Sequence, residues 1–173
     1  DIKLFGLEKN SLQGDAMVQE IYKHFGIETQ FIENGIRLIK SSSKIVKSFD
    51  FDFENCPDIA QTVAVTCAAL GVESRFTGLK TLRIKETDRI FALKKELSKL
   101  GYNINVEGDD LFVQSSLDEI QHSAIDTYDD HRMAMAFAPL ALQAPIEIND
   151  EDVVVKSYPS FWKDLESVGF EFS

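Results

Sequence analysis

An internally repeated pattern is the feature that most constrains this chain of 173 residues. A helical stretch of apolar residues ends at a glycine and is followed by two short strands, first around Gly26 and again around Gly101. A third, truncated copy, "FWKDLESVGFEF", ends at Gly169, and the three glycines are 75 and 68 positions apart. Such a recurrence indicates one supersecondary unit used several times, with a core shared between neighbouring units.

Local signals support this interpretation. In the first copy the dipeptide Asn34-Gly35 predicts a hairpin turn, and in the second copy two strands are expected around Gly108-Asp109. Two further helices begin between the copies, in "CPDIAQTVAVTCAALG" and "YDDHRMAMAFAPLAL", where Pro139 should kink the second.

The predicted fold class is therefore α/β (α+β), built of repeated units that each hold two helices and a short sheet. Helices from different units would pack inside, and the short sheets would lie outside. No linker or low-complexity segment interrupts the chain, so we expect residues 1–173 to form a single domain. The chain opens with Asp1-Ile2-Lys3-Leu4, as if in the middle of a strand, which predicts that it is a fragment.

Composition excludes several classes of partner. The net charge of −11 argues against a nucleic acid or an anionic membrane as partner, and no apolar run is long enough to span a bilayer. Cys56 and Cys67 form no CxxC pair, so we predict that both are packing residues and that the protein occupies a reducing compartment. His24 and His122 have no partners at ligand spacing, and we expect no metal site and no cofactor.

Charged residues crowd the start of the helix in "TLRIKETDRIFALKKEL". Glu86 precedes Ile90 and Leu93 at helical spacing, so we predict that it extends the buried stripe to the helix tip, beside Lys85 and Arg89. One interpretation is a solvated first turn in which the acids meet the helix dipole and Arg89 pairs with one of them. The other is an anion site, because cations at a helix N-terminus oppose the dipole unless an anion joins them. The residue types leave both open.

Three other positions invite the same comparison. Asp58 lies in the first turn of a predicted helix behind Pro57, where an acid commonly serves the dipole alone. His131 and Arg132 lie at the tip of an apolar helix, which suits either a second anion site or a structural pair. Lys156 follows three valines, so it is predicted at the end of a buried strand, pointing into a cleft or into solvent.

Taken together, "RIKETDR", "YDDHRMAMAF", "CPDIAQT" and "VVVKSYPSFW", in this order and spacing, resemble the EPSP synthase family over essentially the whole chain. The resemblance implies two globular domains, each of three βαβαββ units, with helix N-termini directed at the cleft between the domains. This chain would then be most of the second (C-terminal) domain, and its partner would be the missing N-terminal domain.

The resemblance also implies a reaction. An enolpyruvyl group passes from phosphoenolpyruvate to the 5-hydroxyl of shikimate 3-phosphate by addition and then elimination, releasing phosphate, in the shikimate pathway of aromatic amino-acid biosynthesis. Both substrates are polyanions, which would account for cations at helix tips in an acidic protein. A cytoplasmic location is the expectation for a bacterial member, and plastids are the alternative.

Roles carried over from the family begin with the proton-transfer groups. Asp58 matches the carboxylate that contacts the attacking hydroxyl, and Glu86 matches the one proposed to move protons at the methylene carbon. Lys85 would contact a ring hydroxyl of the shikimate ligand and share in proton transfer. Lys156 would bind the leaving phosphate and protonate it.

The remaining family roles concern binding. Arg89 and Arg132 match the pair that grips the phosphoenolpyruvate carboxylate, and His131 supports that grip. Thr81 stands where some members have an asparagine that contacts the shikimate ligand; it keeps one hydroxyl and lacks the reach of the amide.

Two other functions stay open at this point. One is the related enolpyruvyl transfer to UDP-N-acetylglucosamine, and the other is a non-catalytic anion-binding domain. With half of the cleft missing, we expect the isolated fragment to be inactive.

Overall fold

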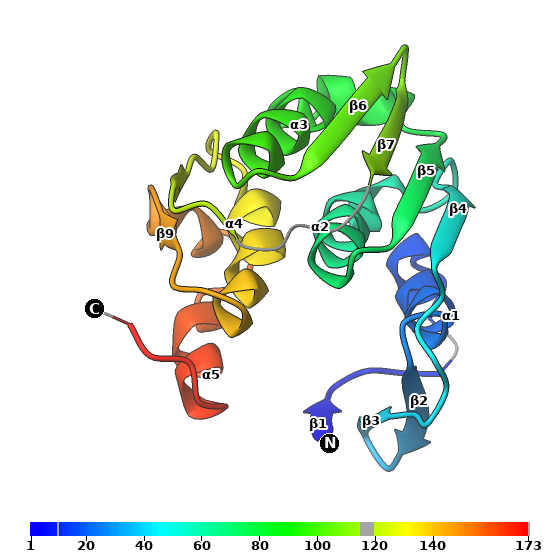
Figure 1. The fold of residues 1–173 in the computed structure, drawn as a ribbon. Coiled ribbons are helices and arrows are strands. Elements are labelled where there is room, and N and C mark those ends of the chain that lie inside the picture. Colours follow the sequence, from blue (N-terminus) through cyan, green and yellow to red (C-terminus); the bar gives the residue numbers. More distant parts are fainter. Residues whose placement is uncertain (10, 115–119, 173) are drawn as a thin grey trace.

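The computed structural model describes residues 1–9, 11–114 and 120–172. Its central repeat is complete and runs strand, helix, strand, helix, strand, strand (Figure 1). With η denoting a 3₁₀ helix, its elements are β4 (Ser48–Asp52), η2 (Pro57–Ile59), α2 (Ala60–Leu70), β5 (Glu73–Thr77), η3 (Lys80–Ile84), α3 (Arg89–Lys99), β6 (Asn103–Glu107) and β7 (Asp110–Gln114). These strands form a sheet in the order β4-β5-β7-β6, in which β4 and β5 pair parallel and the other pairs are antiparallel.

The first repeat reproduces the second half of the central one. It consists of β1 (Ile2–Phe5), η1 (Gly14–Met17), α1 (Val18–Lys23), β2 (Ile27–Ile32) and β3 (Gly35–Lys40). The sheet order β1-β3-β2 corresponds to β5-β7-β6 of the central repeat. Along the chain, α1 lies between β1 and β2, as α3 lies between β5 and β6.

The last repeat reproduces the first half of the central one. It consists of β8 (Ala124–Ile125), α4 (His131–Phe137), η4 (Ala138–Leu142), β9 (Glu147–Ile148), η5 (Glu151–Val154) and α5 (Phe161–Ser167). β8 and β9 pair parallel across α4, as β4 and β5 do across α2, because parallel strands need a crossover connection. Pro139 lies in η4, where the α-helix gives way to a 3₁₀ turn, as its missing N–H predicts.

The glycines that end the helices have the backbone that their positions require. Gly26, Gly101 and Gly169 have φ values of 79°, 94° and 104°, in the left-handed region that favours glycine after a helix. The predicted hairpin turn is displaced by one residue, because Ile32 pairs with Gly35 and the loop is Glu33 and Asn34.

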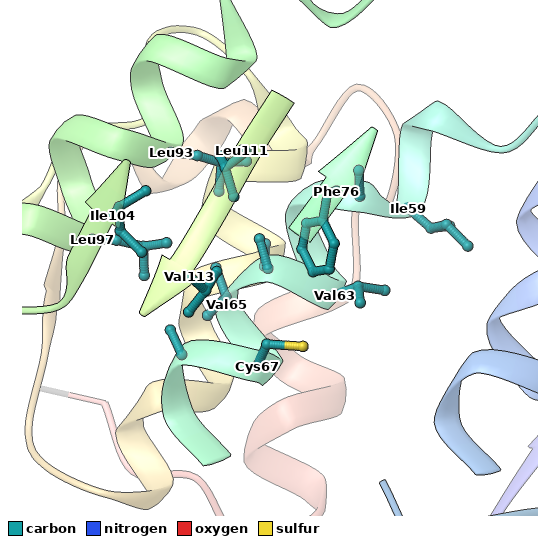
Figure 2. Close-up of a cluster of buried hydrophobic side chains, with 14 of the residues drawn as sticks. Ile59, Val63, Val65, Cys67, Phe76, Leu93, Leu97, Ile104, Leu111 and Val113 are labelled. Carbon is teal, nitrogen blue, oxygen red and sulfur yellow. The ribbon is translucent and has the colours of Figure 1, made fainter. Parts of the chain in front are cut away.

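The hydrophobic core lies between the helices and the central sheet. Figure 2 shows side chains of α2, α3 and the β5–β7–β6 strands meeting in one cluster, among them Phe76, Leu97 and Val113. α2 packs against both α3 and α4, and it is apolar and buried around most of its circumference, as expected for a central helix. The expected arrangement of inner helices and outer sheets is confirmed (Figure 1). Cys56 and Cys67 are buried and free.

In the part of the chain that the structure describes, no helix combines the length and apolar character needed to cross a bilayer.

Candidate active site

Three helix starts converge on the side chain of Arg89. Asp58 lies in the 3₁₀ turn that leads into α2, Arg89 is the first residue of α3, and Asp130 is the N-cap of α4. The Asp130 carboxylate accepts a hydrogen bond from the Arg132 N–H at 2.9 Å, so the cap residue itself fixes the start of α4. Residues far apart in the sequence are thereby brought together by the N-termini of three packed helices.

The Arg89 guanidinium is buried and held by carboxylates. Only 1% of the residue is exposed, and Nε donates to Asp130 Oδ2 at 2.6 Å while Nη2 donates to Asp130 Oδ1 at 3.2 Å. Nη1 donates to Asp58 Oδ1 at 2.9 Å, and Nη2 also donates to Glu86 Oε2 at 2.7 Å. A guanidinium has five N–H donors, so most of them are already used inside the chain. An incoming anion must therefore compete with Asp58 and Glu86 for most of these donors.

Asp58 links three cations of this junction, Arg89, Lys85 and Arg132. Its Oδ1 forms an ion pair with Lys85 Nζ at 3.2 Å, and its Oδ2 lies 3.8 Å from Arg132 Nη2. The Asp58 carbonyl also accepts from Arg132 Nη1 at 2.9 Å. Partial burial alone would raise the pKa of Asp58, but the Lys85 hydrogen bond and the charges of Arg132, Lys85 and Arg89 outweigh it and lower the pKa. Asp58 is therefore ionised at neutral pH.

The prediction that Glu86 belongs to the buried helical stripe is wrong. α3 begins at Arg89, because the Asp88 side chain caps it by accepting from the Phe91 N–H at 3.0 Å. Lys85 and Glu86 lie in the bend before the cap, and the Glu86 side chain is 41% exposed. The bend still carries both residues to the junction, through the contacts of Lys85 with Asp58 and of Glu86 with Arg89.

Thr81 lies in η3, ahead of this bend, and is exposed. The third cation of the charged stretch, Arg83, belongs to a different group. It pairs with Asp88 at 2.9 Å and with Asp109 at 2.7 Å, so it anchors the cap of α3 to the β6–β7 turn. The solvated-end interpretation is confirmed in that Arg89 pairs with Glu86, and it is wrong in that Arg89 is buried rather than solvated.

His131 and Arg132 occupy the tip of α4 as predicted. Arg132 is the more accessible guanidinium of the junction, with 29% of its side chain exposed, and its Nη2 also donates to Asp15 Oδ2 at 3.3 Å. Burial lowers the pKa of His131, as do the Arg132 and Lys156 charges, against the opposing effects of Asp130 and Glu86. His131 is thus neutral at pH 7, and its buried Nδ1 has no hydrogen-bond partner among the described residues.

The predicted strand before Lys156 is not formed. Val153 and Val154 lie in the 3₁₀ helix η5, which packs on α4 and buries Val154, so the valines serve helix packing rather than a sheet. Lys156 follows in an exposed turn, where Nζ donates to the Asp129 carbonyl at 2.7 Å. This bond places Lys156 next to the start of α4.

Two residues of the junction were not among the predicted site residues. Asp130 is fully buried and provides both the cap of α4 and the bidentate partner of Arg89, a role that its place before His131 could have suggested. Asp15 reaches Arg132 from a position 117 residues earlier, and no local signal in the sequence indicates that contact.

The arrangement suits the binding of a small polyanion beside carboxylates that can exchange protons. Lys85, Arg132 and Lys156 are accessible cations around the buried Arg89, and Asp58 and Glu86 lie between them. Within the described ranges, no group of three or more His, Cys, Asp or Glu side chains is placed to hold a metal ion.

Comparison with known proteins identifies the family. The sequence model of the family described as EPSP synthase (3-phosphoshikimate 1-carboxyvinyltransferase) matches residues 1–165. The chain belongs to the EPSP synthase family. A 3-phosphoshikimate 1-carboxyvinyltransferase of Bacteroides fragilis is 48% identical over 173 residues, covering 98% of this chain and 42% of that protein. The corresponding protein of Vibrio atlanticus is 37% identical over 167 residues, and the match covers 96% of this chain and 38% of that protein.

The fold is also that of solved members of the EPSP synthase family. An EPSP synthase structure from Acinetobacter baumannii superimposes with a TM-score of 0.78 at 22% identity, over 96% of this chain and 41% of that one. The α/β enolpyruvyltransferase fold is thus shown. The chain spans about two fifths of the length of the curated relatives that it matches.

Proposed function

We propose that this chain is the second, C-terminal domain of an EPSP synthase, and that the whole protein transfers the enolpyruvyl group of phosphoenolpyruvate to the 5-hydroxyl of shikimate 3-phosphate. The observation that carries the proposal is the convergence of Asp58, Arg89 and Arg132 from three helix starts into one hydrogen-bonded junction. The reaction needs anion-binding groups beside proton-transfer groups, and this junction holds both.

Phosphoenolpyruvate binding is assigned to the two arginines. Arg132 is accessible, and its guanidinium can form the bidentate pair that a carboxylate favours. Arg89 joins it when Glu86 leaves the guanidinium, since Glu86 Oε2 takes the Nη2 donor that a substrate carboxylate would use. His131, neutral at pH 7, lies at the same helix tip and supports this grip without adding charge.

Proton transfer is assigned to groups that surround the arginines. Asp58 is ionised, which is the state needed to accept the proton of the attacking hydroxyl. Glu86, once released from Arg89, can deliver a proton to the methylene carbon of phosphoenolpyruvate and later remove one. Lys85, paired with Asp58, contacts the shikimate ligand, and Thr81, exposed in η3, supplies a further hydroxyl for it.

Release of phosphate is assigned to Lys156. Its ammonium is tethered to the Asp129 carbonyl beside the tip of α4, where it can neutralise the leaving group and donate a proton to it. The reaction needs the rest of the cleft, so the missing N-terminal domain is the partner within the same polypeptide, and a cytoplasmic location accompanies the proposal.

Calorimetric titration of the full-length protein tests the substrate assignment. We expect shikimate 3-phosphate to bind to the wild type, and we expect Arg132→Gln to weaken phosphoenolpyruvate binding in its presence. Arg75→Gln is the matched control, since Arg75 pairs with Asp110 on the central sheet, away from the junction. Binding of UDP-N-acetylglucosamine in place of shikimate 3-phosphate would overturn the proposal in favour of the related transferase, and binding of neither would leave a non-catalytic domain.

A further inference from the structure

The turn that leads into α4 has an unusual backbone. Tyr128 and Asp129 have φ values of 56° and 55°, so two consecutive residues with side chains adopt the left-handed conformation. Residues with side chains keep this strained conformation only where the surroundings hold it, and a bulky aromatic residue is rare there. This turn immediately precedes Asp130, His131 and Arg132, so whatever holds it also sets the geometry of the junction.

α3 holds this turn at two points. Arg89 donates to Asp130 at 2.6 Å at one end of the turn, and Glu96 accepts from the Tyr128 hydroxyl at 2.5 Å at the other. Glu96 lies seven residues after Arg89, which is two helical turns or about 10 Å along the same face of the helix. One rigid helix therefore fixes the turn on both sides.

The Glu96 carboxylate is buried, and both of its oxygens have polar partners. It is 0% exposed, and its Oε2 accepts from the Asp126 N–H at 3.0 Å and pairs with Lys99 at 2.7 Å. These contacts anchor the strand end that leads into the turn, while Oε1 receives Tyr128. A buried carboxylate that loses one of its partners is strongly destabilising. The turn is therefore held in the one arrangement that keeps all of these contacts.

The position of the turn determines where Arg132 and Lys156 lie. Asp130 caps α4 and aligns Arg132, and the Asp129 carbonyl accepts from Lys156 at 2.7 Å. A shift of the left-handed residues would displace both contacts, and small displacements of positioning groups can cost a large factor in rate.

We propose that Glu96 is a positioning residue that acts through the Tyr128 hydroxyl to fix the 128–129 turn, and thereby the places of Arg132 and Lys156. The catalytic meaning of this inference rests on the proposed function. The positioning itself is a property of the fold, and it can be measured without turnover.

The experiment compares Tyr128→Phe with Tyr102→Phe in the full-length protein. Tyr102 is the matched control, because its hydroxyl also donates to a side chain, that of Gln143 at 3.3 Å, outside the junction; Tyr102 is buried and Tyr128 is half-buried. We expect Tyr128→Phe to lower kcat about tenfold, and Tyr102→Phe to leave it near the wild-type value. We also expect faster amide hydrogen exchange in the segment 127–132 for Tyr128→Phe alone.

A double variant tests whether Glu96 acts through Tyr128. Glu96→Ala combined with Tyr128→Phe should be no less active than Glu96→Ala alone, since both remove one interaction. If Glu96→Ala does not fold, the Tyr128→Phe comparison still decides. Wild-type kcat and wild-type exchange in Tyr128→Phe would overturn the inference, as would equal losses in the two tyrosine variants. A wild-type protein without turnover would refute the proposed function instead. The amide hydrogen exchange of the segment 127–132 would then still test whether the Tyr128 hydroxyl fixes the turn.

Discussion

Replacement of Asp130 by asparagine separates the charge of this residue from its capping role. Asparagine caps helices as well as aspartate does, so Asp130→Asn should preserve the hydrogen bond to the Arg132 N–H while removing the charge that faces Arg89. Arg89 is 1% exposed, and its guanidinium would lose its closest carboxylate. Breaking a buried ion pair costs about 3–5 kcal/mol.

The expected loss is smaller than that upper range, because Arg89 keeps two other partners. Asp58 and Glu86 still contact the guanidinium, and the asparagine oxygen still accepts one hydrogen bond. We therefore expect Asp130→Asn to lower the free energy of unfolding by about 2–3 kcal/mol.

Asp88→Asn is the matched control in the same urea-denaturation assay. Asp88 also caps a helix and pairs with an arginine, but it and Arg83 are each about one-third exposed, so the loss should be about 0–1 kcal/mol. Arg89→Met added to Asp130→Asn should recover part of the loss, since it removes the buried charge that Asp130→Asn leaves without its closest carboxylate. Equal destabilisation by Asp130→Asn and Asp88→Asn would refute the claim that buried charge at Arg89 organises the junction.

Three further predictions concern Glu86, Asp58 and the cysteines. Glu86→Gln should slow turnover of the full-length protein while calorimetry finds substrate binding little changed; turnover at the wild-type rate would remove Glu86 from the mechanism. Because the pKa of Asp58 is lowered from 3.8, the stability it contributes should be present above about pH 4 and lost as the pH falls through its folded value, so urea unfolding of wild type and Asp58→Asn should converge in acid. A pH-independent difference between them would contradict this. Burial raises the pKa of Cys67 to about 12 and also raises the pKa of Cys56, so a thiol reagent at pH 8 should label neither until the protein is unfolded, and rapid labelling of the native protein would show that the core is open.

The fold was largely predictable because its signals are local and repeated. Gly26, Gly101 and Gly169 mark the helix ends in the sequence, and each has the left-handed backbone that the pattern requires. The valines before Lys156 were misleading, because β-branched residues indicate burial as well as strands, and here Val154 is buried in a 3₁₀ helix against α4.

The site was predictable in its residues more than in its geometry. The charges of Lys85, Glu86 and Arg89 can be recognised as a group in the sequence. Helical periodicity alone also predicts that the helix includes Glu86, but the Asp88 side chain caps α3, so the helix begins only at Arg89. Glu96 shows the opposite limit. Beside Lys99 it looks like one half of an exposed i,i+3 pair, and only the packing of the 128–129 turn reveals it as a buried anchor.

The most direct test of the central claim is phosphate release from phosphoenolpyruvate by the full-length protein, measured with shikimate 3-phosphate as the acceptor. The account predicts release that depends on this acceptor and that falls steeply in Arg132→Gln but not in Arg75→Gln. Release that requires UDP-N-acetylglucosamine, or that is unaffected by loss of Arg132, would contradict it.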